Sequence, residues 1–237
     1  MTSSPLATHP SACDNCPDRS ARVFCSLSPE VRRDFDSIGM RVSLPRGATL
    51  FKEDDPCTNA IIICSGQVKL SCASKEGKTH ILKIALPGDV LGLSAAISGT
   101  NYEVTAETLG PAEVKSIRCD DLLHFLGSHK EAAMHAARAL SEEYRSAFVD
   151  ARRLALSSTA GGKLAMILLN WGRTPECNQP QMRFMMVLSH DELGNLAGVS
   201  RETVTRELGK FQKQKLIKVT GASIQILEPV RLAQLAG

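Results

Sequence analysis

The segment from Gly127 to Leu156 constrains the fold more than any other part of the chain. It contains no proline and, after its first residue, no glycine, and it is rich in Ala, Glu, Leu and Arg, which favour helix. About 30 helical residues span roughly 45 Å, more than the diameter of a small domain. The sequence therefore predicts one long helix, and its length favours contact with a second copy of the chain.

Small and apolar residues recur along this helix at alternating spacings of four and three. This heptad pattern is typical of a seam between two helices. We expect a homodimer, although the stripe could instead pack on the chain's own first domain, as most apolar stripes do. The predicted interface residues are Ala133, Ala137, Leu140, Tyr144, Ala147, Ala151 and Leu154.

Short β-type runs dominate the sequence before this helix. Between Pro45 and Arg118, runs such as AIIIC, QVKLSC, HILKIAL and EVKSI are separated by turns that contain glycine. Many short, evenly spaced strands favour a barrel or roll. SPEVRRDFDSI at 28–38 predicts a short helix before the roll, with Ser28 as its N-cap. After the long helix, SSTAGG at 157–162 predicts a hinge between two domains.

The stretch at 188–219 carries the most specific signal. Ser189 can cap a first helix, Ser200 can cap a second, and a tight turn that contains a glycine lies between them. LIKVTGASIQIL then predicts a hairpin that turns between Thr220 and Ser223. Together these elements predict a winged helix-turn-helix; the alternative is a solvated pair of amphipathic helices. The residues of the second helix expected to face inward are Val204, Leu208 and Phe211.

Polar and charged residues occupy the outer face of this second helix. A recognition helix presents such side chains to DNA base edges, where Arg can bind guanine and Glu can accept from cytosine. From Ser200 to Lys218, six Lys or Arg oppose two Glu, which predicts attraction for phosphates although the whole chain carries a formal charge of only +3. The predicted DNA contacts are Ser200, Arg201, Glu202, Thr205, Arg206, Lys210 and Lys213.

Three of the eight cysteines are grouped, because Cys13, Cys16 and Cys25 lie in one short leader. Without a secretory signal, such cysteines indicate thiols or metal ligands in preference to disulfides. Three soft thiolates within reach of one centre suit an iron–sulfur cluster or zinc. Thiol–disulfide switching and inert thiols are the other interpretations. Three further cysteines are expected only to fill core or surface positions: Cys57, Cys64 and Cys72.

The order of roll, long helix and helix-turn-helix resembles the CRP/FNR family of bacterial transcription regulators. The segments that carry the resemblance are PRGATLFKEDD at 45–55, SGQVKL at 65–70, LPGDVLGL at 86–93 and SRETVTRELGKFQK at 200–213. The resemblance implies an α+β chain with a double-stranded β-helix, a cupin-like roll, as sensor domain. The implied domains are a leader at 1–27, a cyclic-nucleotide-binding-like roll at 28–127, a dimerisation helix at 128–156 and a winged helix-turn-helix at 157–237.

The resemblance also implies partners. The regulator would bind double-stranded DNA as a homodimer and read a palindromic, TGTGA-like operator through Arg201, Glu202 and Arg206. Contact with RNA polymerase is implied as well, without a residue to carry it. Cyclic AMP is not expected: the cyclic-nucleotide branch holds ribose with Gly-Glu and phosphate with Arg-Ser, whereas this chain has Gly92-Leu93 and Tyr102-Glu103 there.

The leader cysteines resemble those of the oxygen-sensing branch, which implies a 4Fe–4S cluster that responds to oxygen, nitric oxide or redox state. Their last gap is longer here, and the branch's fourth cysteine aligns nearest Lys115. Cys119 is the replacement that we expect, ahead of Cys72 or a carboxylate. The predicted ligands are Cys13, Cys16, Cys25 and Cys119; the alternative is another small-molecule or thiol-based signal, with zinc or no metal.

Other classes of protein are disfavoured. No run approaches the roughly 20 apolar residues that a bilayer requires, and the segment at 1–11 lacks the features of a signal peptide, so we expect a cytoplasmic location and no membrane partner. Cys13 and Cys16 could form an oxidoreductase pair, but their neighbourhood is a loop leader and not a βαβ unit. No GxSxG, P-loop or HExxH motif is found. We therefore expect no enzymatic activity.

Overall fold

The computed structural model describes residues 23–74, 79–156, 159–172 and 182–236, and for residues 149–156 it describes only the helical backbone. The chain divides into two compact units, and the main division falls within the long helix between Ser146 and Ala147; the short segment Ser74–Ile81 is grouped with the second unit. The units have separate hydrophobic cores. None of the helices in the described ranges is long and apolar enough to cross a membrane.

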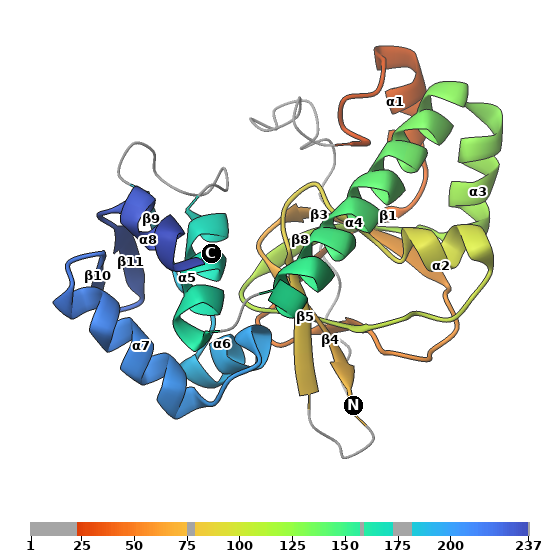
Figure 1. The fold of residues 1–237 in the computed structure, drawn as a ribbon. Coiled ribbons are helices and arrows are strands. Elements are labelled where there is room, and N and C mark those ends of the chain that lie inside the picture. The colour runs from red at the N-terminus through yellow and green to blue at the C-terminus, as the bar shows by residue number, and fades with distance from the viewer. Residues whose placement is uncertain (1–22, 75–78, 157–158, 173–181, 237) are drawn as a thin grey trace. The chain divides into compact units, whose positions relative to one another are not determined.

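Eight strands in the described part of the first unit form two four-stranded sheets with antiparallel pairing (Figure 1). One sheet has the order β1-β8-β3-β6 and the other the order β2-β7-β4-β5, so the chain crosses repeatedly between them. This arrangement confirms the predicted β-roll. The strands are β1 (Met40–Leu44), β2 (Thr49–Phe51), β3 (Asn59–Ser65), β4 (Val68–Ala73), β5 (Thr79–Ala85), β6 (Val90–Leu91), β7 (Thr105–Thr108) and β8 (Ala112–Arg118).

Both faces of β3 are buried, which explains its continuous apolar run. Ile61 and Ile63 belong to the core between the two sheets, whereas Ala60 and Ile62 belong to a second cluster with the helices. Successive strand residues point to opposite faces, so a single apolar strand serves both clusters. The helices of this unit are α1 (Pro29–Ser37), α2 (Leu93–Ser98), α3 (Cys119–Ser128) and α4 (Lys130–Leu156).

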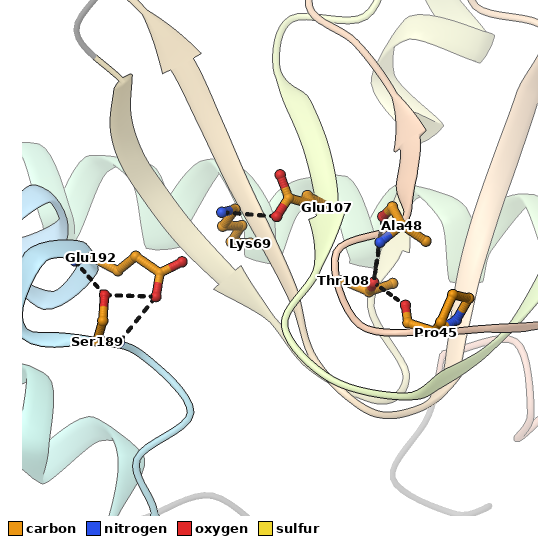
Figure 2. A network of polar contacts seen from close by, with 7 residues as sticks. All are labelled: Pro45, Ala48, Lys69, Glu107, Thr108, Ser189 and Glu192. Atoms are coloured by element: carbon orange, nitrogen blue, oxygen red, sulfur yellow. Dashed lines mark hydrogen bonds and ion pairs between the residues drawn. The ribbon is translucent and has the colours of Figure 1, made fainter.

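A buried threonine closes the turn before β2. The Oγ1 of Thr108 donates to the carbonyl of Pro45 at 2.6 Å and accepts from the N–H of Ala48 at 2.9 Å (Figure 2). Figure 2 also shows Lys69 on β4 and Glu107 on β7, which are cross-strand partners joined by an ion pair of 3.0 Å. The PRGA turn is therefore fixed by hydrogen bonds to β7, a strand far away in the sequence.

The prediction of one continuous helix from Gly127 is wrong at its start. Residues up to Ser128 belong to α3, and α4 begins at Lys130. His129 between them has an extended backbone and its N–H donates to the carbonyl of Phe125 at 3.1 Å. Its side chain lies 3.3 Å from the carboxylate of Asp34 and against the Phe125 ring. Tertiary contacts of one histidine thus override a local sequence that favours helix.

The second unit contains the predicted winged helix-turn-helix and a third strand that the sequence did not reveal. Strands β10 (Ile217–Thr220) and β11 (Ser223–Ile226) form the predicted hairpin, and β9 (Arg183–Met185) pairs with β11. The core is closed by the predicted apolar helix, α5, whose Leu164 and Leu168 are fully buried. The helices are α5 (Ala160–Trp171), α6 (His190–Ala197), α7 (Arg201–Lys213) and α8 (Pro229–Ala236).

The predicted hinge at 157–162 is only partly in the described residues, and its end is helical. Thr159 is the N-cap of α5, and its side chain accepts from the N–H of Gly162 at 3.0 Å. Residues 160–162 therefore form the first turn of α5 and not a flexible link. A threonine before small residues is a capping signal, which outweighs the turn-forming tendency of the two glycines here.

The turn between α6 and α7 is fixed by local signals. Ser189 and Glu192 form a capping box at the start of α6 (Figure 2). Gly198 ends this helix with a φ of 65°, a conformation that favours glycine. Gly194 has a different role, because a Cβ at this position would lie 2.7 Å from the carbonyl oxygen of Val199. The turn can pass this close to α6 only because residue 194 has no side chain.

We predict that Gly194→Ala lowers the free energy of unfolding of the second unit by about 1 to 3 kcal/mol, the usual cost of overpacking. Gly209→Ala is the matched control: it lies within α7, nothing lies within 4 Å of an added Cβ, and the change should stabilise by about 0.5 to 1 kcal/mol. Urea unfolding followed by the fluorescence of Trp171, the single tryptophan, measures both. Equal stability of the two variants would contradict the role assigned to Gly194.

Candidate DNA-binding interface and sensor residues

Helix α7 has one buried face and one exposed face. Val204, Leu208 and Phe211 are buried in the core of the second unit, as predicted. Ser200 is the N-cap, and its Oγ accepts from the N–H of Thr203 at 3.3 Å. The remaining predicted DNA contacts all have exposed side chains on the helix: Arg201, Glu202, Thr205, Arg206, Lys210 and Lys213.

A buried carboxylate positions two of these cations. Glu207 is 8% exposed, and its Oε1 lies 2.8 Å from Nζ of Lys210 and 3.4 Å from Nε of Arg206. The hydrogen bond from Lys210 holds the pKa of Glu207 below its usual range, with a further contribution from Arg206. Hydrogen bonds from its own backbone N–H and from Ser200 likewise lower the pKa of Glu202. Both carboxylates are therefore ionised at neutral pH.

The structure adds His190 to the residues around the recognition helix. Its Nδ1 lies 2.9 Å from Oγ1 of Thr205, and this hydroxyl donates to the carbonyl of Arg201 at 3.1 Å. A hydroxyl has one proton, so Nδ1 of His190 is the donor in this chain of contacts. Sequence reasoning missed His190 because the contact joins two helices and leaves no local pattern.

Most of the predicted interface stripe on α4 is exposed. Ala133, Ala137, Tyr144 and Ala147 face outward, and Tyr144 is 74% exposed. Leu140 differs, since it packs partly against the core of the first unit. The side chains of Ala151 and Leu154 lie outside the described residues. Two apolar side chains beside the stripe are exposed as well: Met134 and Phe148.

A different face of α4 packs on the roll. Ala132 and Ala136 are buried in the cluster that also contains residues of α1 and α3. The alternative in which the predicted stripe covers the chain's own domain therefore does not fit these contacts, apart from Leu140. The exposed apolar surface of α4 lacks a partner within the part of the first unit that the structure describes.

Two of the residues that stand where the resemblance places the ligand contacts of the cyclic-nucleotide branch are buried. Leu93 is 2% exposed and lies in the core beside Gly92. Tyr102 is 4% exposed, its ring stacks on Phe51 at a centroid distance of 3.9 Å, and its hydroxyl donates to the carbonyl of Asn59 at 2.7 Å. A cation and a hydroxyl that could meet a phosphate are replaced by a buried aromatic ring.

The structure describes two of the four predicted metal ligands. Cys13 and Cys16 lie outside the described residues, and Cys25 is half-buried. The Sγ of Cys119 lies 3.3 Å from the Sγ of Cys57 and donates to the carbonyl of Cys57 at 3.4 Å. Burial, followed by the contact with Cys57, raises the pKa of Cys119 to about 12. Cys57, expected only to fill space, thus has a specific sulfur partner.

The described residues do not by themselves form a cluster site. In the ranges that the structure covers, no three His, Cys, Asp or Glu side chains come together to hold a metal ion. Cys119 as the fourth ligand stays a prediction, and its present neighbour is Cys57. Lys115, which aligns nearest the family's fourth cysteine, is 5% exposed; its Nζ donates to the carbonyl of Phe35 and lies 4.3 Å from the centre of the Phe35 ring.

The end of the leader is tied to the start of α4. Ser28 is the N-cap residue of α1, as predicted, but its side chain makes no capping hydrogen bond. Its N–H and Oγ donate instead to the carboxylate of Glu131 at 2.8 and 2.6 Å. These bonds hold the pKa of Glu131 below its usual range. Nδ1 of His135 contacts the carbonyl of Val23. Residues 23–28 therefore reach the first two turns of α4 directly.

Comparison with known proteins extends these observations. Residues 41–129 match the family model of the cyclic nucleotide-binding domain, and residues 162–235 match that of the Crp-like helix-turn-helix domain. The chain is 31% identical over 233 residues to the transcriptional activator protein anr of Pseudomonas aeruginosa, covering 94% of this chain and 93% of the relative. It is 27% identical over 229 residues to the nitrogen fixation regulation protein FixK of Bradyrhizobium diazoefficiens, with coverage of 94% and 93%.

The fold is also similar to a solved structure. That of FixK2 from Bradyrhizobium japonicum matches with a TM-score of 0.74 at 23% identity, covering 84% of this chain and 98% of that one. On this identity and coverage, the chain belongs to the CRP/FNR family of transcription regulators.

Proposed function

We propose that the protein regulates transcription as a homodimer that reads a two-fold symmetric operator through α7. One observation carries this proposal: Arg201, Glu202 and Arg206 are exposed in the first two turns of a helix whose opposite face is buried. That geometry lets the N-terminal end of a helix enter the major groove. The two arginines can bind guanine bidentately and the ionised Glu202 can accept from cytosine. A TGTGA-like half-site is the sequence that we propose.

The remaining cations supply affinity without sequence information. Lys210 and Lys213 lie in the last turns of α7, farther along the helix from the end that meets base edges. Contacts of Lys with phosphates release counterions and so weaken as salt rises. The buried Glu207 restrains Lys210 and Arg206, which reduces the side-chain entropy that they lose on binding. The charged face thus divides into base-reading and phosphate-binding parts.

The dimer that we propose forms through the exposed stripe of α4. Two copies of this helix can pack Ala133, Ala137 and Tyr144 against each other, because small residues let helices approach closely while aromatic rings fill the seam. We propose that the dimer binds half-sites about 34 Å apart, which is one turn of DNA. The palindromic operator follows from the two-fold symmetry of the dimer. A contact with RNA polymerase is part of the proposal, without an assigned residue.

The signal that we propose enters through the leader cysteines. Cys13, Cys16 and Cys25 would hold an iron–sulfur cluster, with a fourth ligand for which Cys119 is the candidate. Oxidants would alter an iron–sulfur cluster bound there, and the positions of its cysteine ligands would change with it. Cys25 lies within the segment tied to α4 by Ser28–Glu131 and Val23–His135, so its position is linked to the dimer helix. Zinc or thiol chemistry at the same cysteines is the second candidate.

Cyclic AMP is not part of the proposed signal. The proposal rests on side-chain chemistry: Leu93 and Tyr102 are buried and offer neither a carboxylate for a ribose nor a cation for a phosphate. The match to the cyclic nucleotide-binding domain describes the fold of this unit, and ligand recognition depends on these particular side chains.

The first prediction about DNA binding concerns base readout. Glu202→Ala should relax preference at one position of each half-site, at a cost of about 1 to 3 kcal/mol, and leave binding to random DNA nearly unchanged. Lys213→Ala should weaken binding to operator and random DNA alike and lower the salt slope by about 1. Titrations at several salt concentrations measure both. If the two variants lost affinity equally on both DNAs, the assignment of base and phosphate roles would be wrong.

The second prediction concerns the dimer. Ala137→Glu should place an uncompensated carboxylate in the seam, which gives a monomer by light scattering and abolishes tight operator binding. Glu142→Ala is the matched control on α4, because its ion pair with Arg145 is exposed and contributes little. A dimeric Ala137→Glu protein would place the interface elsewhere.

The third prediction concerns the leader. Protein purified without oxygen should contain iron and labile sulfide and absorb broadly in the visible range, and Cys25→Ser should lose all three signals. Cys64→Ser, near the end of β3, should keep them. Wild-type protein without iron and sulfide would remove the cluster from the proposal and leave zinc or thiol chemistry.

A further inference from the structure

Two thiols outside the leader lie together in the first unit. The Sγ atoms of Cys57 and Cys119 are 3.3 Å apart although 62 residues separate them in the sequence. Both side chains are half-buried and neither is in a disulfide. The fold, and not local spacing, creates this pair.

The backbone on both sides of the pair is held by the sheet. Asn59 on β3 pairs with Arg118 on β8, and the N–H of Cys119 donates to the carbonyl of Thr58 at 3.0 Å. The Sγ of Cys57 lies 3.7 Å from the carbonyl of Gly92. The sulfurs need to approach by only roughly 1 Å to reach the bonding distance of about 2.05 Å.

We propose that Cys57 and Cys119 are a redox-active dithiol that forms an intramolecular disulfide when the protein meets a hydroperoxide. One sulfur attacks a peroxide oxygen, the O–O bond breaks, and a sulfenic acid and an alcohol form, or water where the oxidant is hydrogen peroxide. The second sulfur attacks the sulfenic sulfur, the S–S bond forms, and water leaves. The two thiols lose two electrons and two protons, which the peroxide takes up. A small thiol reverses the step by thiol–disulfide exchange.

The proposed disulfide includes the first residue of α3, a helix that packs in one hydrophobic cluster with α4. Cys119 is the first residue of α3, and Leu122 and Phe125 of the same helix are buried in one cluster with Ala132 and Ala136 of α4. The disulfide covalently fixes the start of α3 to the loop before β3. The dithiol is argued from the contact between Cys57 and Cys119 alone. It shares Cys119 with the proposed leader cluster, for which that residue is the candidate fourth ligand.

The test uses the full-length protein, reduced and then exposed to hydrogen peroxide, with remaining thiols alkylated before non-reducing digestion with trypsin. Cleavage after Lys and Arg places Cys57 in the peptide at 53–69 and Cys119 in the peptide at 119–130. We expect mass spectrometry to find these two peptides joined, and dithiothreitol to separate them. This measurement on the wild-type chain needs no variant.

Cysteine variants identify the sulfurs. The peptide at 53–69 also contains Cys64, so Cys64→Ser is the matched control and should keep the link, whereas Cys57→Ser and Cys119→Ser should lose it. Oxidation should raise the Tm of the wild type and of Cys64→Ser, because the cross-link restricts the unfolded chain. Oxidation should not raise the Tm of Cys57→Ser or Cys119→Ser in this way, because neither variant can form the bond.

Other outcomes overturn the proposal. No link between the two peptides after oxidation, or a link from the peptide at 119–130 to the peptide at 23–32 that carries Cys25, would show that Cys57 and Cys119 are not a functional pair. Loss of iron in Cys119→Ser but not in Cys57→Ser would make Cys119 a cluster ligand instead. Absence of iron from every variant, with the peptide link intact, would remove the leader cluster while the dithiol stands.

Discussion

The burial of one face of α7 is the constraint on which the function of this protein depends. Val204, Leu208 and Phe211 leave water together with the apolar residues of α5 and α6, and each such side chain contributes about 1.5 to 3 kcal/mol. Because the period of the helix is fixed, burying these three positions directs Arg201, Glu202 and Arg206 to solvent. The hydrophobic core thereby determines which side chains are offered to DNA.

Local signals explain why the DNA-binding unit could be predicted in detail from sequence. The caps at Ser189 and Ser200, the left-handed Gly198 and the apolar spacing of α7 all act within a few residues, so the sequence contains them directly. The strand β9 was missed because its pairing with β11 joins segments about 40 residues apart and its three residues are too few to show alternation. Its short length hides it from any periodic pattern.

The first unit was harder to predict because its decisive contacts are long-range. The break at His129 depends on Asp34, and the burial of Lys115 depends on Asp36 and on the carbonyl and ring of Phe35. A lysine in a strand is expected at the surface; here a hydrogen bond and a cation–π contact compensate its desolvation. The position nearest the family's fourth cysteine is thus used to hold α1 on the roll.

The chemistry of sulfur limits the roles that Cys119 can combine. A thiolate is required to bind a metal, whereas a sulfur in a disulfide has no thiolate to offer. Cys119 can therefore serve a leader cluster or the bond to Cys57, but never both at once. The contact of 3.3 Å between the two sulfurs favours the pairing with Cys57. If a cluster forms at the leader while the pair persists, its fourth ligand must come from elsewhere, and the two sites can respond to different oxidants.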